Sequence, residues 1–433
     1  MGKDSKKMDA MALTPISEEG RIDWVSLAFV QAGICVCVPA FLLGALLAEG
    51  MPVWPAIISG SLGYLIVVIG MIATGMIATG MIGADLGLAS CTTCEAGFGK
   101  SGARLIVSII FAVNMIGWFG IQNGVCGEAF TNAVADMTGF HIPVIVSNVL
   151  WGLIMLATAI YGIGALEILN KISIPLLMII MLIGTFLAIK EYGTDALSSR
   201  PKESMSFMSG VALSFNFTAV GTITAADYTR FQKSRKDTVK SVFYGVFPMG
   251  VVTLVLGILL TKLSGQYDVG MVLITIGLPL LGVISIIVST WTTNSTNAYS
   301  AGLNIVMALK IPDNRRRETT LVAGLVGIFL GAVGILAHVE SVLSLLSYVV
   351  CPVGGVILAD YWIVGKGKKT NFRPKDGVNW AGVIAWACGA LVAYFLVKIE
   401  FVGIIVGAIF YLIVEKFIPS TSRPNYKEVE KAK

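Results

Sequence analysis

A run of nine residues, Ser289 to Asn297, holds the densest polar chemistry of the chain. It contains six hydroxyl side chains and two amides, interrupted only by Trp291. Neighbouring hydroxyls such as those of Thr292 and Thr293 can supply hard oxygen ligands to Na⁺, while an Asn amide both donates and accepts hydrogen bonds. Ser and Thr in a helix often bond back to their own backbone. Such local bonds do not account for so many hydroxyl and amide groups in one segment, so the run predicts a binding site.

A second unusual segment interrupts the first apolar run, between Gly33 and Pro39. Proline removes a backbone donor and clashes with the preceding turn, so a helix through this segment should be weakened in mid-membrane. Backbone carbonyls freed by a break of this kind could coordinate a cation. A simple proline kink would explain the same residues, and the segment by itself favours neither interpretation.

Two further apolar runs carry aromatic and polar groups together. Trp118 and Gln122 are four residues apart and share one helix face, where an indole can stack on a flat ring and an amide can bond to its edge. Trp118 could instead be an interfacial anchor, but about a dozen residues separate it from either end of its run. The sixth run contains Asn216, Phe217 and Gly221 in mid-membrane. Interrupted helices at matching places in two halves of a chain indicate a transporter binding site.

The remaining chemical candidates are weaker. Glu128 lies near the outer end of the third run, where a carboxylate can take part in proton coupling but is more often simply solvated. Cys91 and Cys94 form a C-x-x-C pair, yet a zinc site needs two more ligands, and the only histidines, His141 and His338, map to the opposite side of the membrane. The sequence contains no Ser/His/Asp order, P-loop or zinc-protease helix. It therefore predicts neither an enzyme nor a metal cofactor at these residues.

The elements that must position these residues are membrane helices. Of the 433 residues, 56% are hydrophobic and 13% charged, and the mean hydropathy is +0.83. A soluble domain carries about 25% charged residues. The apolar runs have the length of roughly 20 residues that a bilayer requires. About twelve spans are predicted, at residues 25–47, 55–82, 105–130, 142–160, 172–189, 205–226, 242–263, 269–309, 320–337, 339–364, 380–397 and 402–417.

Two features of these spans lead to further expectations. The eighth run is too long for one straight helix, and the part from Gly270 to Gly277 predicts an entry loop or a short helix. Lys and Arg cluster before the first span and after the even-numbered ones. Because positive charge resists translocation, both termini are expected on the cytoplasmic side of the cell membrane. The formal net charge of +5 follows from this bias, so nucleic-acid binding is not predicted.

The two ends of the chain differ in composition from the apolar segments between them. Residues 1–24 are polar and lack the short apolar stretch of a cleavable signal peptide. We therefore expect a transmembrane domain over 25–418, between cytoplasmic tails at 1–24 and 419–433.

Several polar and glycine-containing segments that interrupt the spans form a set of motifs in a characteristic order along the chain. The segments are Gly117-Trp118-Phe119-Gly120, then Gly221-Thr222-Ile223-Thr224 with Asp227-Tyr228-Thr229-Arg230-Phe231, then Trp291-Thr292-Thr293-Asn294, and finally Pro352-Val353-Gly354-Gly355-Val356-Ile357-Leu358-Ala359-Asp360-Tyr361. With them the chain resembles the nucleobase–cation symporter family of purine and cytosine permeases over nearly its whole length. The resemblance implies an all-helical membrane fold with two inverted five-helix repeats, about 25–192 and 205–364. The first and sixth helices are expected to be broken, and two C-terminal helices follow at 380–417.

The resemblance also implies the residues of the site. A planar base is expected between Trp118 and Phe217, at a site in the middle of the membrane that opens alternately to each side. Further substrate contacts are implied at Gln122, Asn216, Ala219, Ser289 and Asn297. Na⁺, the coupling ion and the only cofactor expected, is implied at the carbonyls of Gly33 and Val36 and at carbonyl or hydroxyl oxygens of Ser289, Thr292 and Thr293.

The chain departs from the cytosine-transporting members of the family at several of these positions. Met115 stands where they have Gln, and Gln122 instead follows Trp118 by four residues, as in hydantoin and some purine or allantoin carriers. They also have Asn at the position of Ser289 and Ser at that of Asn216, and Asn297 is the candidate replacement for the missing amide. A shift of one residue in the alignment makes Phe215 the reserve for Phe217.

The resulting prediction is a monomeric secondary transporter that imports a nucleobase, with cytosine first, by Na⁺ symport. A hydantoin, allantoin or purine permease, with proton coupling as an option, is the alternative within the same class. A channel or non-transporting receptor is a remote alternative, because channels usually show a filter signature or rings of charge and neither is evident in the sequence.

Overall fold

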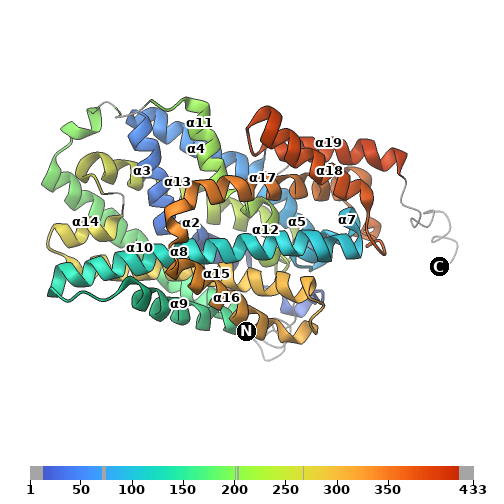
Figure 1. The fold of residues 1–433 in the computed structure, drawn as a ribbon, viewed down its shortest axis with the longest axis horizontal. Coiled ribbons are helices and arrows are strands. Elements are labelled where there is room, and N and C mark those ends of the chain that lie inside the picture. The colour runs from blue at the N-terminus through green and yellow to red at the C-terminus, as the bar shows by residue number, and fades with distance from the viewer. Residues whose placement is uncertain (1–12, 71–74, 200, 202–203, 267, 419–433) are drawn as a thin grey trace.

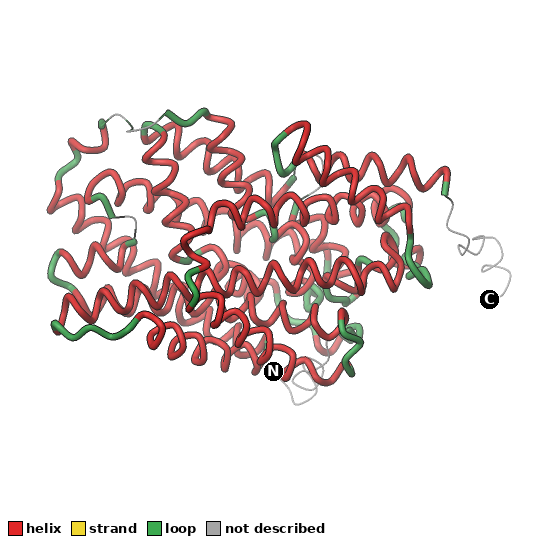
Figure 2. The backbone as a smooth tube through the Cα atoms, viewed as in Figure 1, coloured by secondary structure: helices red, strands yellow, loops and turns green. Residues whose placement is uncertain are grey.

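The computed structural model describes residues 13–70, 75–199, 201, 204–266 and 268–418. These residues form helices joined by short loops (Figures 1 and 2). Within them the only β-pairing is an isolated bridge between Ile22 and Gln232. The expected all-helical class is confirmed.

The first predicted span is broken, not merely kinked. α2 (Trp24–Cys35) and α3 (Val38–Gly50) meet at an angle of 51°. Between them Val36 has φ −86° and ψ 76°, and Cys37 is extended with φ −147° and ψ 159°. Pro39 lies in the first turn of α3, where its missing N–H costs nothing. Proline therefore starts a new helix here instead of bending an existing one.

The second predicted span, 55–82, is divided in the structure. α4 (Val53–Ile69) ends at Gly70, whose φ of 81° suits glycine, and α5 (Met76–Leu86) begins after residues that lie outside the description. Small residues on α5 allow close packing. A Cβ on Gly83 would lie 2.7 Å from Cα of Ala226, so α5 approaches the neighbouring helix closely.

The sixth span is interrupted more mildly than the first. α11 (Phe207–Thr218) and α12 (Gly221–Thr229) are separated by Ala219 and Val220, which keep right-handed helical dihedral angles. The N–H groups of Thr222 and Ile223 bond three residues back instead of four. The hydrogen-bond pattern therefore changes at this point without a sharp bend, and residues 207–229 remain one apolar span.

The predicted division of the eighth run is confirmed. A short helix, α14 (Val269–Thr275), precedes α15 (Pro279–Ala308), with Gly277 in a left-handed conformation between them. The remaining elements are α6 (Ser90–Thr93), α7 (Glu95–Gly102), α8 (Ser108–Thr138), α9 (Val144–Tyr161), α10 (Ile163–Tyr192), α13 (Arg235–Ser264), α16 (Arg316–Ala332), α17 (Val339–Leu358), α18 (Trp380–Leu391) and α19 (Val402–Phe417). Short π-helical segments η2 (Ala103–Val107), η6 (Ala359–Val364) and η8 (Val392–Val397) join or extend them.

Among the described residues, seven helical segments are long and apolar enough to cross a bilayer, and the bent pair α2–α3 makes up to eight. The other predicted spans correspond to the shorter pair α4–α5, to α16 and α19, and to α15, whose polar stretch lowers its hydropathy. α15 packs against α8, α9, α10, α16 and α2, and Figure 1 shows it beside α8 and α16. α18 and α19 pack together at one end.

Candidate functional site

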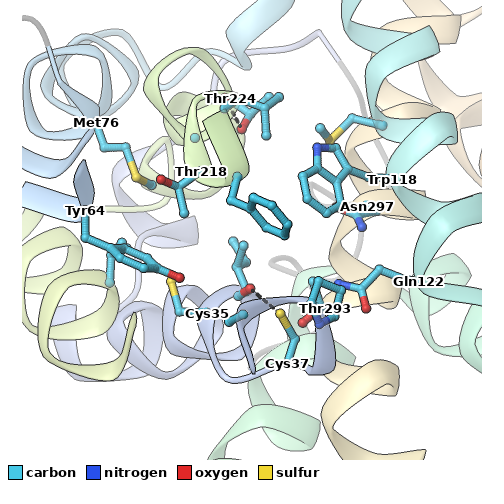
Figure 3. Close-up of a pocket in the computed structure, with 18 of the residues that line it drawn as sticks. Cys35, Cys37, Tyr64, Met76, Trp118, Gln122, Thr218, Thr224, Thr293 and Asn297 are labelled. Carbon is cyan, nitrogen blue, oxygen red and sulfur yellow. Dashed lines mark hydrogen bonds between the residues drawn. The ribbon is translucent and has the colours of Figure 1, made fainter. Parts of the chain in front are cut away.

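A cavity lies at the break of the first span. Its walls come from the α2–α3 break, from α8, from the α11–α12 interruption and from α15 (Figure 3). Its volume is ≈ 70 Å³, several times the roughly 10–15 Å³ that one water molecule needs. The interruptions of the first and sixth spans therefore meet at one chamber, as a binding site between two broken helices requires.

Both aromatic rings expected to hold the substrate line this cavity. Trp118 comes from the middle of α8 and Phe217 from the last turn of α11, and each is only 7% exposed. Their ring centroids are 6.3 Å apart, and their planes are inclined by 65°. The expected pair of rings is thus brought together, but edge to face and not as a parallel sandwich. A flat ligand would have to turn one of the rings to lie between them.

Two amide atoms in the cavity wall lack a protein partner. Gln122 lies one turn beyond Trp118 on α8, and its Oε1 has no hydrogen bond; Asn297 of α15 has an unpaired Nδ2 (Figure 3). Both side chains are more than nine-tenths buried. An unpaired polar group inside a protein costs about 1–3 kcal/mol. The cavity therefore offers one acceptor and one donor to a ligand.

Three predicted substrate contacts do not line the cavity. Asn216 is half-buried with an unpaired Oδ1 but points elsewhere, because one residue along a helix rotates the side chain by about 100° from Phe217. Ala219 is fully buried, and its carbonyl accepts the Thr222 hydroxyl at 2.6 Å. The Ser289 hydroxyl donates to the carbonyl of Ile286.

Oxygen atoms from two helices gather behind the cavity. The Thr293 hydroxyl donates to the Gly33 carbonyl at 2.5 Å, and the Thr292 hydroxyl reaches the same oxygen at 3.3 Å. The two hydroxyls also lie 3.5 and 3.0 Å from the Ser289 carbonyl. Val36 is buried in the break and follows the last turn of α2, where helix-terminal carbonyls carry partial negative charge. Four of the five residues implied for Na⁺ thus meet, and Val36 adjoins them.

The polar run on α15 serves two purposes. Thr293 and Asn297 face the cavity, four residues apart on one side of the helix. Asn294 donates to the Phe119 carbonyl at 3.2 Å, and Ser295 donates to the Met155 carbonyl at 3.0 Å. These last two groups join α15 to α8 and α9, so part of the polar run holds the scaffold and only part faces the site.

Gly33 is required by a residue that the sequence analysis did not single out. A Cβ at Gly33 would lie 1.7 Å from Oδ1 of Asn170, a fully buried residue of α10. The Asn170 amide donates to the Leu166 carbonyl at 2.7 Å. Glycine therefore lets α10 approach the oxygen cluster. The signal that could have revealed Asn170 is an amide inside an otherwise apolar run.

Further cavity residues were also missed, among them Cys37, Tyr64, Thr218, Thr224 and Tyr228. Cys37 is in the extended break beside Thr293 and Gln122, and Tyr64 lies across the cavity with Met76 (Figure 3). Thiols, hydroxyls and aromatic rings are ordinary in membrane helices. These residues can therefore be recognised as cavity residues only because the fold brings them together.

A buried network lies next to the cavity on α12. Tyr228 lines the cavity, and its hydroxyl lies 3.2 Å from that of Ser300. Asp227 accepts the backbone N–H of Ser90 at 2.8 Å and the Ser300 hydroxyl at 2.7 Å. Arg230 donates to the Tyr299 hydroxyl at 2.8 Å. These contacts tie α12 to α6 and α15 on the side that the charge bias assigns to the cytoplasm.

The weaker candidates lie outside the site. Glu128 is exposed and does not line the cavity. Cys91 and Cys94 are buried free thiols, and no metal-binding group of three His, Cys, Asp or Glu residues occurs among the described residues. Phe215 packs against Phe401 with ring centroids 5.3 Å apart, so Phe217 is the ring that faces the cavity.

Comparison with known proteins identifies the family. Residues 15–416 match the family described as permease for cytosine/purines, uracil, thiamine, allantoin. The chain belongs to this permease family. It is 28% identical to the cytosine permease of Escherichia coli strain K12 over 422 residues, which cover 96% of each chain. The protein is therefore a multi-pass membrane permease for small molecules and not an enzyme.

Solved structures share the permease's fold. Mhp1, described as a nucleobase-cation-symport-1 family transporter in a closed conformation with bromovinylhydantoin bound, superimposes with a TM-score of 0.82 at 19% identity. The match covers 95% of this chain and 96% of Mhp1. A Na⁺-coupled sialic acid symporter matches with a TM-score of 0.61 at 14% identity, over 98% of this chain and 94% of the other. The expected inverted-repeat fold is thus confirmed.

Proposed function

We propose that the permease imports a neutral, planar nucleobase together with Na⁺ by alternating access, with cytosine as the first candidate. One observation carries the proposal. Gln122 and Asn297 line a cavity that also contains the rings of Trp118 and Phe217, and each has an amide atom, Oε1 and Nδ2 respectively, without a hydrogen-bond partner. A base with an N–H and a ring nitrogen or carbonyl at its edge satisfies both amides, while its faces meet the rings.

The charge of the lining supports a neutral substrate. Among the described residues that line the cavity, none is Asp, Glu, Lys, Arg or His. A charged ligand would lose its hydration there without gaining a counter-ion, which is costly in a low-dielectric interior. A cationic or anionic substrate is therefore disfavoured.

The oxygen cluster supports coupling to Na⁺. Gly33, at the end of α2, contributes a carbonyl to the cluster, and Ile34, Cys35 and Cys37 directly after it line the cavity. A cation bound there would fix the break in the shape that forms the cavity wall. Each ligand would then strengthen the binding of the other, and this reciprocity is what symport requires.

The observations distinguish less clearly between individual bases. Similarity to a cytosine permease over 96% of the chain favours cytosine. Met115, however, lines the cavity at the position where cytosine carriers have Gln. A hydantoin, allantoin or purine is therefore the second candidate.

Counterflow in proteoliposomes tests the substrate. Liposomes preloaded with unlabelled cytosine should take up labelled cytosine, because a carrier exchanges substrate across the membrane and a channel does not. Unlabelled hydantoin, allantoin, uracil and hypoxanthine are added as competitors. Stronger competition by one of these than by cytosine would transfer the assignment to that compound. Absence of counterflow when each labelled compound is tested against a preloaded pool of the same compound would refute a heterocycle carrier.

Thr293→Ala tests the cation. The variant removes a hydroxyl that contacts the Gly33 carbonyl, so the Na⁺ concentration for half-maximal uptake should rise about tenfold. Ser295→Ala is the matched control, because it removes a neighbouring hydroxyl that contacts α9 instead. Equal Na⁺ responses in both variants, or full accumulation driven by a proton gradient without Na⁺, would exclude the proposed ion site.

A further inference from the structure

A second pocket lies outside the transport site, on the side of the membrane that the charge bias assigns to the cytoplasm. Its volume is ≈ 410 Å³. The last turn of α5, the first residue of α13 and the loop after η6 line it, through Asp85, Arg235, Gly367, Lys368, Lys369 and Thr370. None of these residues lines the transport cavity.

An ion pair joins the elements around this pocket. Arg235 donates through Nε and Nη2 to the Asp85 carboxylate at 2.6 to 3.0 Å, and the Tyr361 hydroxyl of η6 donates to the same carboxylate at 2.6 Å. Arg235 also donates to the Gly367 carbonyl, and its guanidinium carbon lies 4.9 Å from the centroid of the Trp362 ring. The pocket is therefore built into the packing of α5, α13 and η6.

A tight turn places Lys368 and Lys369 beside the ion pair. Gly367 has a left-handed φ of 62°, and its N–H donates to a backbone carbonyl of η6 at 2.9 Å. The side-chain amide of Asn371 closes the turn by donating to the Gly365 carbonyl at 2.9 Å. Both lysines are exposed, and neither belongs to a salt bridge among the described residues.

The pocket carries an excess of positive charge. Asp85 is the only acidic residue among the described residues that line it, and its charge is matched by Arg235. Lys368 and Lys369 therefore contribute two charges without a counter-ion. Two ammonium groups at one pocket favour an anion, and Lys is a common ligand of phosphate groups in proteins.

The position of the pocket in the membrane indicates which anion fits. Arg235 begins α13 and η6 ends at Val364, so the pocket lies where two apolar spans end. On the same two elements Val239, one turn into α13, and Ile363 are exposed apolar side chains. Cationic groups at the membrane surface next to exposed apolar groups match a phospholipid, whose phosphate is joined to acyl chains. A free anion would use only the cationic part.

We propose that this pocket binds the phosphate headgroup of an anionic phospholipid from the adjoining leaflet. Lys368 and Lys369 contact the phosphate, and the acyl chains lie along the exposed apolar side chains of α13 and η6. Arg235 stays paired with Asp85 and keeps the three elements together. Because the unfolded chain has no such pocket, the bound lipid stabilises the folded protein.

Thermal unfolding of the full chain in a neutral detergent tests this without substrate or Na⁺, so its failure is separate from that of the proposed transport function. Phosphatidylglycerol, which is anionic, and phosphatidylcholine, which has no net charge, are titrated in parallel. We expect phosphatidylglycerol to raise the unfolding temperature at lower concentrations. In the double variant Lys368→Gln/Lys369→Gln, the phosphatidylglycerol concentration for half-maximal stabilisation should rise about tenfold.

A matched double variant separates the pocket from the general charge of this face. Lys310→Gln/Arg317→Gln removes two exposed charges between α15 and α16, on the same side of the membrane but outside the pocket. It should change the half-maximal concentration about twofold or less. An equal loss in both double variants would overturn the proposal. Equal stabilisation by phosphatidylcholine, or by inorganic phosphate at the same concentration, would overturn it as well.

Discussion

Recognition of the proposed base depends on two single side chains, Gln122 and Asn297. Each has an unpaired amide atom and lines a cavity whose other walls are largely aromatic, aliphatic or sulfur-containing. In such surroundings a lost hydrogen bond is not replaced by water, so discrimination between ligands can be large. The aromatic pair Trp118 and Phe217 adds contact area but little directional choice.

Gln122→Leu tests this view at the residue scale. Removing the acceptor while keeping the volume should weaken substrate affinity about 10–100-fold, since the ligand N–H then loses its partner. Asn216→Ala, which alters a predicted contact outside the cavity, should change affinity about twofold or less. Substrate affinity measured by isothermal titration or scintillation proximity would decide. A larger loss for Asn216→Ala would mean that the substrate binds elsewhere.

At the scale of elements, the Asp227 network joins α12 to α6 and α15. Its hydrogen bonds to Ser90 and Ser300 are completely buried. Because α12 supplies Thr224 and Tyr228 to the cavity wall, this attachment closes the cavity beside the network. Opening toward that side requires the contacts between α12 and α15 to separate.

Asp227→Ala should therefore destabilise the protein strongly. The change leaves the Ser90 N–H and the Ser300 hydroxyl without their carboxylate, at a cost of about 1–3 kcal/mol for each buried group. Asp376→Asn is the control, because it breaks an exposed pair with Lys100 that contributes little. Thermal unfolding in detergent measures both, and equal transition temperatures for the two variants would contradict the assignment.

At the scale of the whole molecule, orientation follows from the distribution of Lys and Arg. The bias predicts cytoplasmic termini, with the loop after α10 outside and the loop after η6 inside. An impermeant maleimide should label Thr194→Cys in intact cells and Thr370→Cys only after permeabilisation; both positions are exposed. Six of the seven native cysteines are buried, which keeps the background low. The reverse pattern would invert the predicted topology.

Much of this architecture could be predicted from the sequence because only apolar segments of sufficient length can span a bilayer. Apolar length sets the spans. Proline at position 39 indicated a weak point in the first span, but the sequence did not distinguish a kink from the break that the structure shows. The division of the eighth run was visible for the same reason, since its length exceeds what one straight helix can use. The oxygen cluster at Gly33 and Thr293 was also predicted, by resemblance to a family whose motifs this chain carries in order.

Sequence alone did not determine the direction in which each polar side chain points. A polar residue on a helix meets whichever neighbour its face turns toward, and each step along the helix rotates that face by about 100°. Only packing decided that Asn297 faces the cavity while Asn294 fastens α15 to α8, and that Phe217 enters the site while Asn216 does not. Asn170 acquires its role from Gly33, a residue far away in the chain. Composition therefore determined the membrane class and the helices, and tertiary contacts determined which of their polar groups share one cavity.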